Sequence, residues 1–286
     1  MTLSQSFAFI GGGNMAGALI HGLIETGTAR AEQVLVSDVR PEGLAQLHQR
    51  YGVRTSTDNR EACRSDVVIL SVKPQIFPAL LPDIAPHLGA SSLVISIAAG
   101  VPLAAIEAQL PAARVVRAMP NTPALASAGA TALAGGVRAS TADLALASAI
   151  FASVGEVVTV TDAQMDAVTA LSGSGPAYVF LLVESLATAG AQLGLPPEVA
   201  AQLAAQTVYG AGKLLHESSD TPSELRRKVT SPGGTTAAGL QALEQHGFPA
   251  AVAACLDAAC RRGGELGREA ADKLAAAQGG GKTGRD

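Results

Sequence analysis

The run Gly11-Gly12-Gly13-Asn14-Met15-Ala16 constrains the fold of this chain more than any other segment. It follows the apolar residues 7–10 and opens a helical pattern over 14–26. The run matches Gly-x-Gly-x-x-Ala, in which the first glycine permits a tight turn, the second lets a pyrophosphate approach and the alanine permits close helix–strand packing. The helix start would add unpaired N–H groups. The segment therefore predicts a dinucleotide-binding strand–loop–helix unit, with a glycine-rich turn that holds no ligand as the alternative.

The first half of the chain alternates strand patterns with helical patterns, which predicts a parallel, doubly wound α/β sheet of the Rossmann type. The expected strands are 7–10, 34–37, 67–72, 93–97 and 114–117, with a further pair at 130–134 and 156–160. After about residue 163, strand patterns give way to long helical windows. We therefore expect a nucleotide-binding domain over 1–163, an all-α helical dimerisation domain over 164–276 and a disordered tail over 277–286.

The helical half is rich in alanine and apolar side chains, among them Val208, Tyr209, Leu214 and Leu215. This composition predicts an interface between subunits, with a monomeric core as the alternative. The apolar stretch 177–194 contains Glu184, which favours a buried helix over a membrane span.

Charge and cysteine content exclude several classes of protein. A net charge of −4 argues against a nucleic-acid surface. The cysteines at 63, 255 and 260 fit neither a zinc spacing nor a disulfide framework, and the five histidines are scattered, so no metal site is expected. The N-terminus lacks a basic segment followed by an apolar one, so we expect no signal peptide, no membrane anchor and a cytoplasmic protein.

The second strand ends in Ser37-Asp38-Val39-Arg40. An acidic residue at this place binds the ribose hydroxyls and favours NAD, whereas a nearby arginine and serine accommodate the 2′-phosphate of NADP. Asp38 favours NADH and Arg40 favours NADPH, so both cofactors remain candidates. Asp38 is also placed to cap the helix that begins near Pro41.

Two later strand ends carry small or mobile side chains where ligands bind in such sheets. Val72-Lys73-Pro74 follows one strand, and Ala98-Ala99-Gly100 follows the next. The small residues would let a nicotinamide lie against the backbone. Lys73 is explained equally well as a ribose or phosphate contact and as a solvated loop lysine.

Three segments are candidates for holding a small substrate. Asn121 offers an amide in the loop that follows Arg117. Arg117 itself requires no anion-binding role, because it is explained as a structural residue that pairs with a carboxylate such as Asp166 or Glu184. The runs 172–176 (SGSGP) and 231–236 (SPGGTT) each offer hydroxyls and N–H groups at an expected helix start. Either run alone is an ordinary capped turn. Together with the glycine loop, they predict a reductase for a small anion that works by cofactor and positioning.

At these residues the chain resembles the pyrroline-5-carboxylate reductases, from about residue 5 to about residue 275. The resemblance is carried by residues 9–16, 72–74, 96–100, 117–123, 171–178 and 231–236. It implies reduction of 1-pyrroline-5-carboxylate to L-proline with NADPH or NADH, the last step of proline biosynthesis. It also implies an intertwined homodimer, assembly of dimers into a decamer, and an active site between one subunit's nucleotide domain and its partner's helices.

The resemblance assigns a role to individual residues. Thr236 lies near the ring nitrogen and is the expected catalytic residue. The expected cofactor-binding residues are Gly11, Gly13, Asn14, Met15, Ser37, Asp38, Arg40, Asn59, Val72, Lys73, Pro74, Ala98 and Ala99. The expected substrate-binding residues are Asn121, Ser172, Ser174, Ser231, Gly233, Gly234, Thr235 and Thr236. Asp38 beside Ser37 departs from some members of the family, which leaves the preference for NADPH open.

Two rival readings share parts of these patterns. A β-hydroxyacid dehydrogenase would need a catalytic lysine on the helix after its glycine-rich loop, but residues 177–180 are followed by no lysine before Lys213. A non-catalytic NAD(P)-binding regulator should lack the second anion loop, which this chain has.

Overall fold

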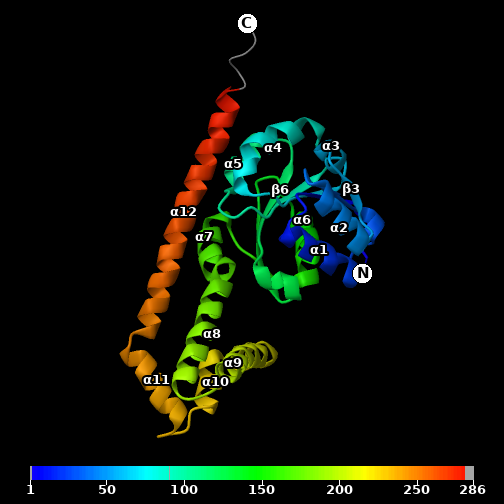
Figure 1. Ribbon diagram of the computed structural model, residues 1–286. Helices are drawn as coiled ribbons and strands as arrows, with labels where there is room; N and C mark the ends of the chain where they lie inside the picture. Colours follow the sequence, from blue (N-terminus) through cyan, green and yellow to red (C-terminus); the bar gives the residue numbers. More distant parts are fainter. Residues whose placement is uncertain (1, 90, 281–286) are drawn as a thin grey trace. The chain divides into compact units, whose positions relative to one another are not determined.

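The computed structural model, which describes residues 2–89 and 91–280, divides into two compact units (Figure 1). One contains the chain up to Ser174 together with the residues from Ala259 onward, and the other contains Gly175–Ala258. The division after Ser174 differs from the expected domain boundary at 163/164, because the short helix α7 (Met165–Val168) and the π-helical turn Thr169–Gly173 belong to the first unit. Of the expected tail, residues 277–280 continue the last helix, and 281–286 lie outside the described residues.

The first unit is built on an eight-stranded sheet in the order β3-β2-β1-β4-β5-β6-β7-β8, which confirms the doubly wound α/β prediction. The strands are β1 (Phe7–Ile10), β2 (Val34–Ser37), β3 (Arg54–Ser56), β4 (Val67–Leu70), β5 (Leu93–Ser96), β6 (Arg114–Met119), β7 (Gly129–Gly135) and β8 (Gly155–Thr159). All neighbours pair in parallel except β6 and β7. β1 lies between β2 and β4, so the strand order reverses at the end of β1, where such sheets bind their ligands.

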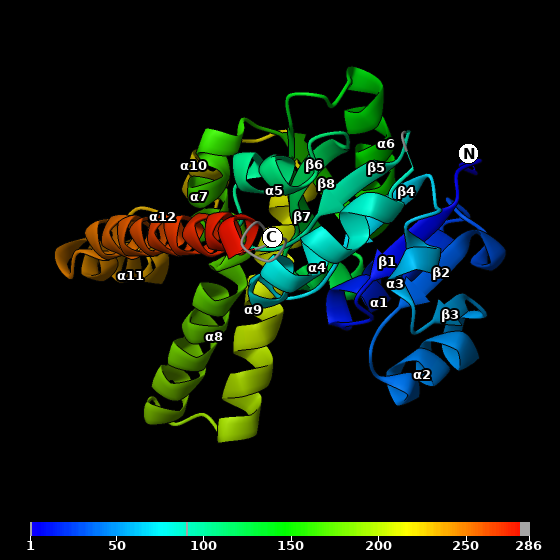
Figure 2. The same ribbon diagram turned by 90° about the horizontal axis from the view of Figure 1, so that it is seen from above.

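Alternate residues of each central strand face two separate hydrophobic cores. Phe7 and Phe9 join the core formed with α1 (Asn14–Glu25), α2 (Pro41–Tyr51) and α6 (Thr141–Phe151). Ala8 and Ile10 join the core formed with α3 (Asn59–Ala62), α4 (Phe77–Ile84) and α5 (Leu103–Gln109). Figure 2 shows α4 and α5 next to each other beside the strands. Burial on both faces explains why the strands read as continuous apolar runs.

The last helix, α12 (Phe248–Gly280), ends in the first unit. Leu274 is fully buried in the second of the two cores, and the side chain of Gln109 donates a hydrogen bond to the Leu274 carbonyl at 2.7 Å. The sequence indicates a helix here, but its periodicity does not say which core the helix joins. The residues from Ala259 are therefore part of the nucleotide unit, although the sequence assigned them to the helical domain.

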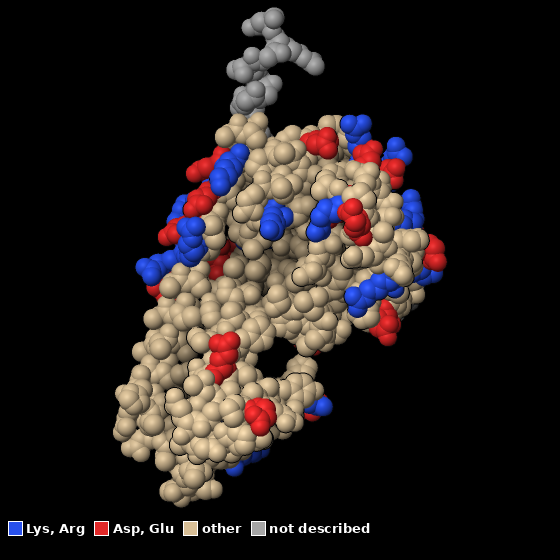
Figure 3. Space-filling model, in the orientation of Figure 1, with Lys and Arg blue, Asp and Glu red and all other residues tan. Residues whose placement is uncertain are grey.

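The second unit consists of α8 (Gly175–Gln192), α9 (Pro197–Glu217), α10 (Pro222–Lys228), α11 (Thr235–Gln245) and the start of α12. Within residues 175–258, only Ala200 and Ala204 are buried. Phe180 and Leu181 are 61% and 62% exposed, so the apolar stretch of α8 is not buried by its own chain, contrary to the expectation for 177–194. In Figure 3, charged side chains gather on the sheet unit and are sparse over the helical unit.

By length and composition, the helical stretch 162–192 is also apolar enough to cross a membrane, since an 18-residue window within it has a mean hydropathy of 1.3. The same composition is required of a helix whose apolar side is covered by another protein chain.

Candidate active site

The glycine loop sits where β1 passes into α1. Gly11 has a φ of +102°, and a Cβ built on it would lie 2.8 Å from the carbonyl oxygen of Ser71. The position therefore accepts only glycine, for reasons of both conformation and space. The Ser71 hydroxyl donates a 2.6 Å hydrogen bond to the Gly11 carbonyl, which fixes the loop to the turn after β4.

Gly13 differs from Gly11, because a Cβ built on it would meet no atom within 4 Å. It precedes the first turn of α1, which contains no acidic residue and whose N–H groups have no intrahelical acceptor. Asn14 is exposed and Met15 half-buried in that same turn. An open space above unpaired N–H groups fits an anionic pyrophosphate, as the sequence predicts.

Asp38 forms a contact that the sequence did not indicate. Its Oδ2 accepts a 2.8 Å hydrogen bond from the N–H of Gly12, and its carboxylate receives the Arg40 guanidinium at 3.1 Å on both oxygens. Partial burial raises the pKa of Asp38, but the hydrogen bonds from Arg40 and Gly12 outweigh it and hold that pKa below its ordinary value. The two residues are thus partners of each other. Arg40, and not Asp38, occupies the cap position of α2.

Ser37 and Asn59 lie together on the expected adenosine side. The buried Ser37 hydroxyl donates a 2.7 Å hydrogen bond to the side-chain oxygen of Asn59. Asn59 is the first residue of α3, which Asp58 caps by accepting from the N–H of Arg60. The buried Ser37 therefore orients the half-buried side chain of Asn59, whose amide is a group that ribose hydroxyls can bind.

The two expected nicotinamide segments follow adjacent parallel strands, since Leu70 of β4 pairs with Ser96 of β5. Ala98 is buried, Ala99 is exposed, and Ala99 and Pro74 line a cavity of about 230 Å³. Leu266, Ala270 and Lys273 of α12 form its other wall. Val72 is half-buried in the preceding turn. Lys73 is exposed, without an ion pair to any described residue, so both explanations of it stand.

The first substrate segment is held mainly by backbone contacts. The Asn121 amide donates to the Ser172 carbonyl at 3.0 Å and accepts from the N–H of Ala130 at 2.8 Å. The Ser172 hydroxyl donates to the Val168 carbonyl at 3.1 Å, and the N–H of Ser174 donates to the Thr169 carbonyl at 2.8 Å. Asn121 therefore fixes the position of the 172–174 turn, and its own amide is already satisfied on both sides.

Arg117 is a structural residue, as one reading of the sequence held, but with another partner. Its guanidinium pairs with Asp162 at 2.7 Å, and not with Asp166 or Glu184. The side chain of Arg117 is only 4% exposed.

The second substrate segment, residues 231–236, belongs to the helical unit. Gly233 has a φ of +71°, and the N–H of Gly234 donates to the Ser231 carbonyl at 3.0 Å, which closes a tight turn before α11. Gly234 is the cap residue of α11, and no side chain caps that helix. Thr235 and Thr236 are exposed in its first turn. The Thr236 hydroxyl has no hydrogen-bond partner among the described residues.

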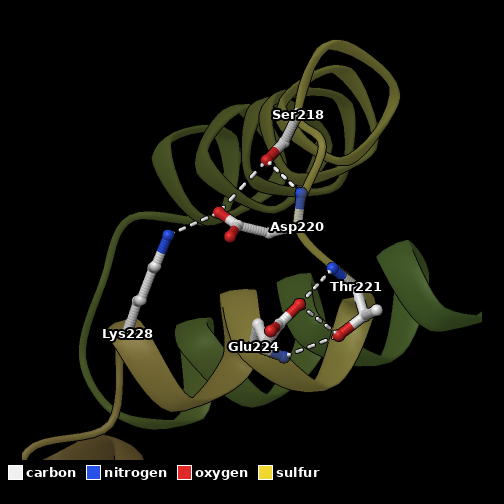
Figure 4. A network of polar contacts seen from close by, with 5 residues as sticks. All are labelled: Ser218, Asp220, Thr221, Glu224 and Lys228. Carbon is white, nitrogen blue, oxygen red and sulfur yellow. Dashed lines mark hydrogen bonds and ion pairs between the residues drawn. The ribbon is translucent and has the colours of Figure 1, made fainter.

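A polar network holds the segment that leads into this loop (Figure 4). Lys228 at the end of α10 pairs with Asp220, which also contacts the Ser218 hydroxyl at 3.2 Å. The hydrogen bond from Lys228 lowers the pKa of Asp220. Thr221 and Glu224 form the capping box that the sequence predicts. Both ends of α10 are thereby fixed, which sets where the 231–236 loop begins.

The described residues offer little support for catalysis by a metal ion or by a cysteine thiol. They contain no cluster of three side chains able to hold a metal ion. The cysteines are free thiols, and burial raises the pKa of Cys63 to about 11, with smaller contributions from Asp83 and Asp58. A thiol with such a pKa is a poor nucleophile at neutral pH.

Comparisons with known proteins agree with this arrangement. Residues 162–266 match the family described as pyrroline-5-carboxylate reductase dimerisation, and residues 6–100 match the NADP oxidoreductase coenzyme F420-dependent family. A pyrroline-5-carboxylate reductase of Synechocystis is 45% identical over 269 residues, covering 93% of this chain and 100% of the relative.

Two solved structures are similar in fold and sequence. The pyrroline-5-carboxylate reductase of Coxiella burnetii has a TM-score of 0.87 and 40% identity, with 92% of this chain and 99% of that chain covered. The Plasmodium falciparum pyrroline carboxylate reductase with NADP bound has a TM-score of 0.82 and 31% identity, with 93% and 100% covered.

The open space at Gly13 leads to a first prediction. Gly13→Val should abolish NADPH binding, because its side chain fills the path of the pyrophosphate. It should leave the melting temperature nearly unchanged, because a Cβ at this position meets no atom of the chain within 4 Å. Gly13→Ala should have an intermediate effect. Fluorescence titration with NADPH and thermal unfolding measure the two quantities. Unchanged NADPH affinity in Gly13→Val would remove the loop from the site.

The Asp38–Arg40 pair leads to a second prediction. Asp38→Ser should raise the ratio of kcat/KM for NADPH to that for NADH, and Arg40→Ala should lower it. Each change should be up to about fivefold, because the exposed Arg40 leaves these charge contacts at the protein surface. Asp38→Ser should also weaken both cofactors, since the N–H of Gly12 loses its acceptor. Steady-state kinetics with each cofactor test both effects. A ratio that moves in neither variant would place the specificity contacts elsewhere.

Proposed function

The chain belongs to the pyrroline-5-carboxylate reductase family, and on that premise we propose how its residues carry out the reaction. The enzyme is an NAD(P)H-dependent oxidoreductase that reduces the C=N bond of 1-pyrroline-5-carboxylate to give L-proline, the last step of proline biosynthesis. A bound nicotinamide supplies the hydride. The residues described above have to bind the two molecules, align them and hold a hydrogen bond to the ring nitrogen.

We assign the cofactor to the edge of the sheet formed by the ends of β1, β2, β4 and β5. The open N-terminus of α1 supports binding of the pyrophosphate there. Ser37 and Asn59 are proposed to hold the adenosine ribose, and the Ala98–Ala99 turn to lie against the nicotinamide. Lys73 and Pro74 border the same edge. These assignments need no acid–base residue, which agrees with a reaction that depends on positioning.

We assign the substrate to the 231–236 loop, with Ser172, Ser174 and Asn121 shaping the other side. The backbone N–H groups of Gly233 and Gly234 and the hydroxyls of Ser231 and Thr235 are proposed to bind the carboxylate at the start of α11. The hydroxyl of Thr236 is proposed to donate to the ring nitrogen. The observation that carries this role is that the hydroxyl is exposed at a helix start and caps nothing.

The enzyme is a homodimer formed through its dimerisation domain. We propose that the apolar helical unit is covered by its partner, because Phe180, Leu181 and Tyr209 are more than 60% exposed in one chain. We further propose that the active site is shared between subunits, that dimers assemble into a decamer, and that the enzyme is cytoplasmic, where its free thiols stay reduced.

The exposed helical unit leads to a prediction about assembly. The protein should not be found as an active monomer of about 29 kDa, because its helices cannot bury their apolar faces alone. Light scattering at the enzyme concentration used for assays measures the mass. An active monomer would contradict the shared site.

Thr236 leads to the most discriminating prediction. Thr236→Ala should lower kcat by at least ~10-fold, since a hydrogen bond of ~1.5–3 kcal/mol made mainly in the transition state corresponds to roughly 10- to 150-fold. Thr236→Ser keeps the donor and should retain most activity. Because the Thr236 hydroxyl caps nothing, Thr236→Ala should not show the stability loss of about 0.5–2 kcal/mol that follows removal of a helix cap.

The measurement is NAD(P)H oxidation with 1-pyrroline-5-carboxylate, together with thermal unfolding of each variant. The wild-type enzyme should be inactive toward a 3-hydroxy acid with NAD(P)⁺. Near-normal kcat with a lowered melting temperature in Thr236→Ala would refute the catalytic role.

A further inference from the structure

A second cavity of the nucleotide unit lies away from the glycine loop. Its volume is about 250 Å³, and it opens between the Gly100–Pro102 turn, the start of α7 and the part of α12 from Gly264 to Ala271. Four charged side chains line it: Arg117, Asp162, Asp166 and Arg268. None of the residues assigned to the cofactor or the substrate is among its lining.

Two of these charged groups already satisfy each other. Arg117 donates to Asp162 at 2.7 Å, and the other oxygen of Asp162 accepts from the N–H of Leu103 at 3.1 Å. This pair forms a fixed and neutral wall of the cavity. It is therefore the other two groups that decide what the cavity can bind.

Asp166 and Arg268 carry opposite charges and do not pair with each other. Neither makes an ion pair or a side-chain hydrogen bond with a described residue. On the same helix, Glu265 and Glu269 are both engaged by Arg262, at 2.7 Å and 3.2 Å. The hydrogen bond from Arg262 is the main cause of the lowered pKa of Glu265, and the positive charge of Arg268 lowers this pKa further.

Gly264 shows that the two groups converge. A Cβ built on Gly264 would lie 3.3 Å from Oδ2 of Asp166 and 3.5 Å from a terminal guanidinium nitrogen of Arg268. The absent side chain thus leaves a space bordered by one carboxylate oxygen and one guanidinium nitrogen. A ligand atom in this space would be within reach of both.

From this geometry we propose that the cavity binds a small zwitterionic α-amino acid. The ligand carboxylate pairs with the Arg268 guanidinium, and the ligand ammonium pairs with Asp166. Asp166 is half-buried and Arg268 is exposed. A cation would contact Asp166 alone, and an anion would contact Arg268 alone. An α-amino acid carries both charges on adjacent groups, so it satisfies both side chains at once. The site is separate from the proposed active site and does not depend on the proposed function.

Calorimetric titration of the full-length protein with L-alanine tests the proposal. Propionate and ethylammonium, which each keep one charged group of alanine, serve as matched ligands. L-alanine should bind, and each single-charge ligand should bind at least ~10-fold more weakly, as expected when a charged hydrogen-bonded contact is lost. Propionate binding as tightly as L-alanine would overturn the proposal in favour of a plain anion site, and absence of L-alanine binding would overturn it outright.

Three variants locate the binding. Arg268→Ala and Asp166→Asn should each weaken L-alanine at least ~10-fold. Gly264→Ala should do the same by filling the space, and it should not unfold the protein, because alanine is favoured over glycine inside a helix. Arg261→Ala removes an exposed arginine of the same helix outside the cavity and should bind normally. Wild-type affinity in Gly264→Ala and Arg268→Ala would show that L-alanine binds elsewhere.

Discussion

The close approach of Gly11 to the backbone of Ser71 is the contact on which the nucleotide unit depends. It lets β1 turn into α1 directly beside the end of β4, at the point where the strand order reverses. The ends of β2, β4 and β5 then meet at the same edge of the sheet. Because these strands are parallel, strand ends as far apart in the chain as Ser37 and Ser96 come to the same edge of the sheet. A larger residue at position 11 would separate the turn from that edge.

Signals that lie within a few residues were readable from the sequence. The strand 7–10, the glycine loop, the helix that follows it and the capping box at Thr221 are all local patterns, and the structure contains each of them. β3 was missed because it has three residues and exposed polar side chains, which leave no apolar pattern. β7 was expected as a strand at 130–134, and it extends by one residue beyond both bounds to span Gly129–Gly135.

Contacts between residues that lie far apart in the chain could not be predicted from local patterns. The hydrogen bond from Gly12 to Asp38 joins residues of two strand ends, and nothing in either segment marks it. The sequence predicted that Arg117 pairs with a carboxylate. That the partner is Asp162 and not Asp166 depends on how the turn after β8 folds back. Leu274 joins the sheet's core only because α12 returns to the first unit. Of the candidate site, the sequence therefore indicated which residue types were present, and the structure added which of them are already engaged: Asn121 on both sides, Thr236 on neither.

The position of Asp38 has an evolutionary consequence. An aspartate that only touched the ribose could be exchanged in one mutational step when a lineage changes from one nicotinamide cofactor to the other. Here the same carboxylate supports Gly12 and neutralises Arg40, so its loss disturbs the glycine loop and frees a guanidinium at once. A change of cofactor along this lineage would need a second substitution that restores an acceptor for Gly12, and the order of the two substitutions would matter. The adaptive path is therefore epistatic, and intermediates that lack the restoring residue would be selected against.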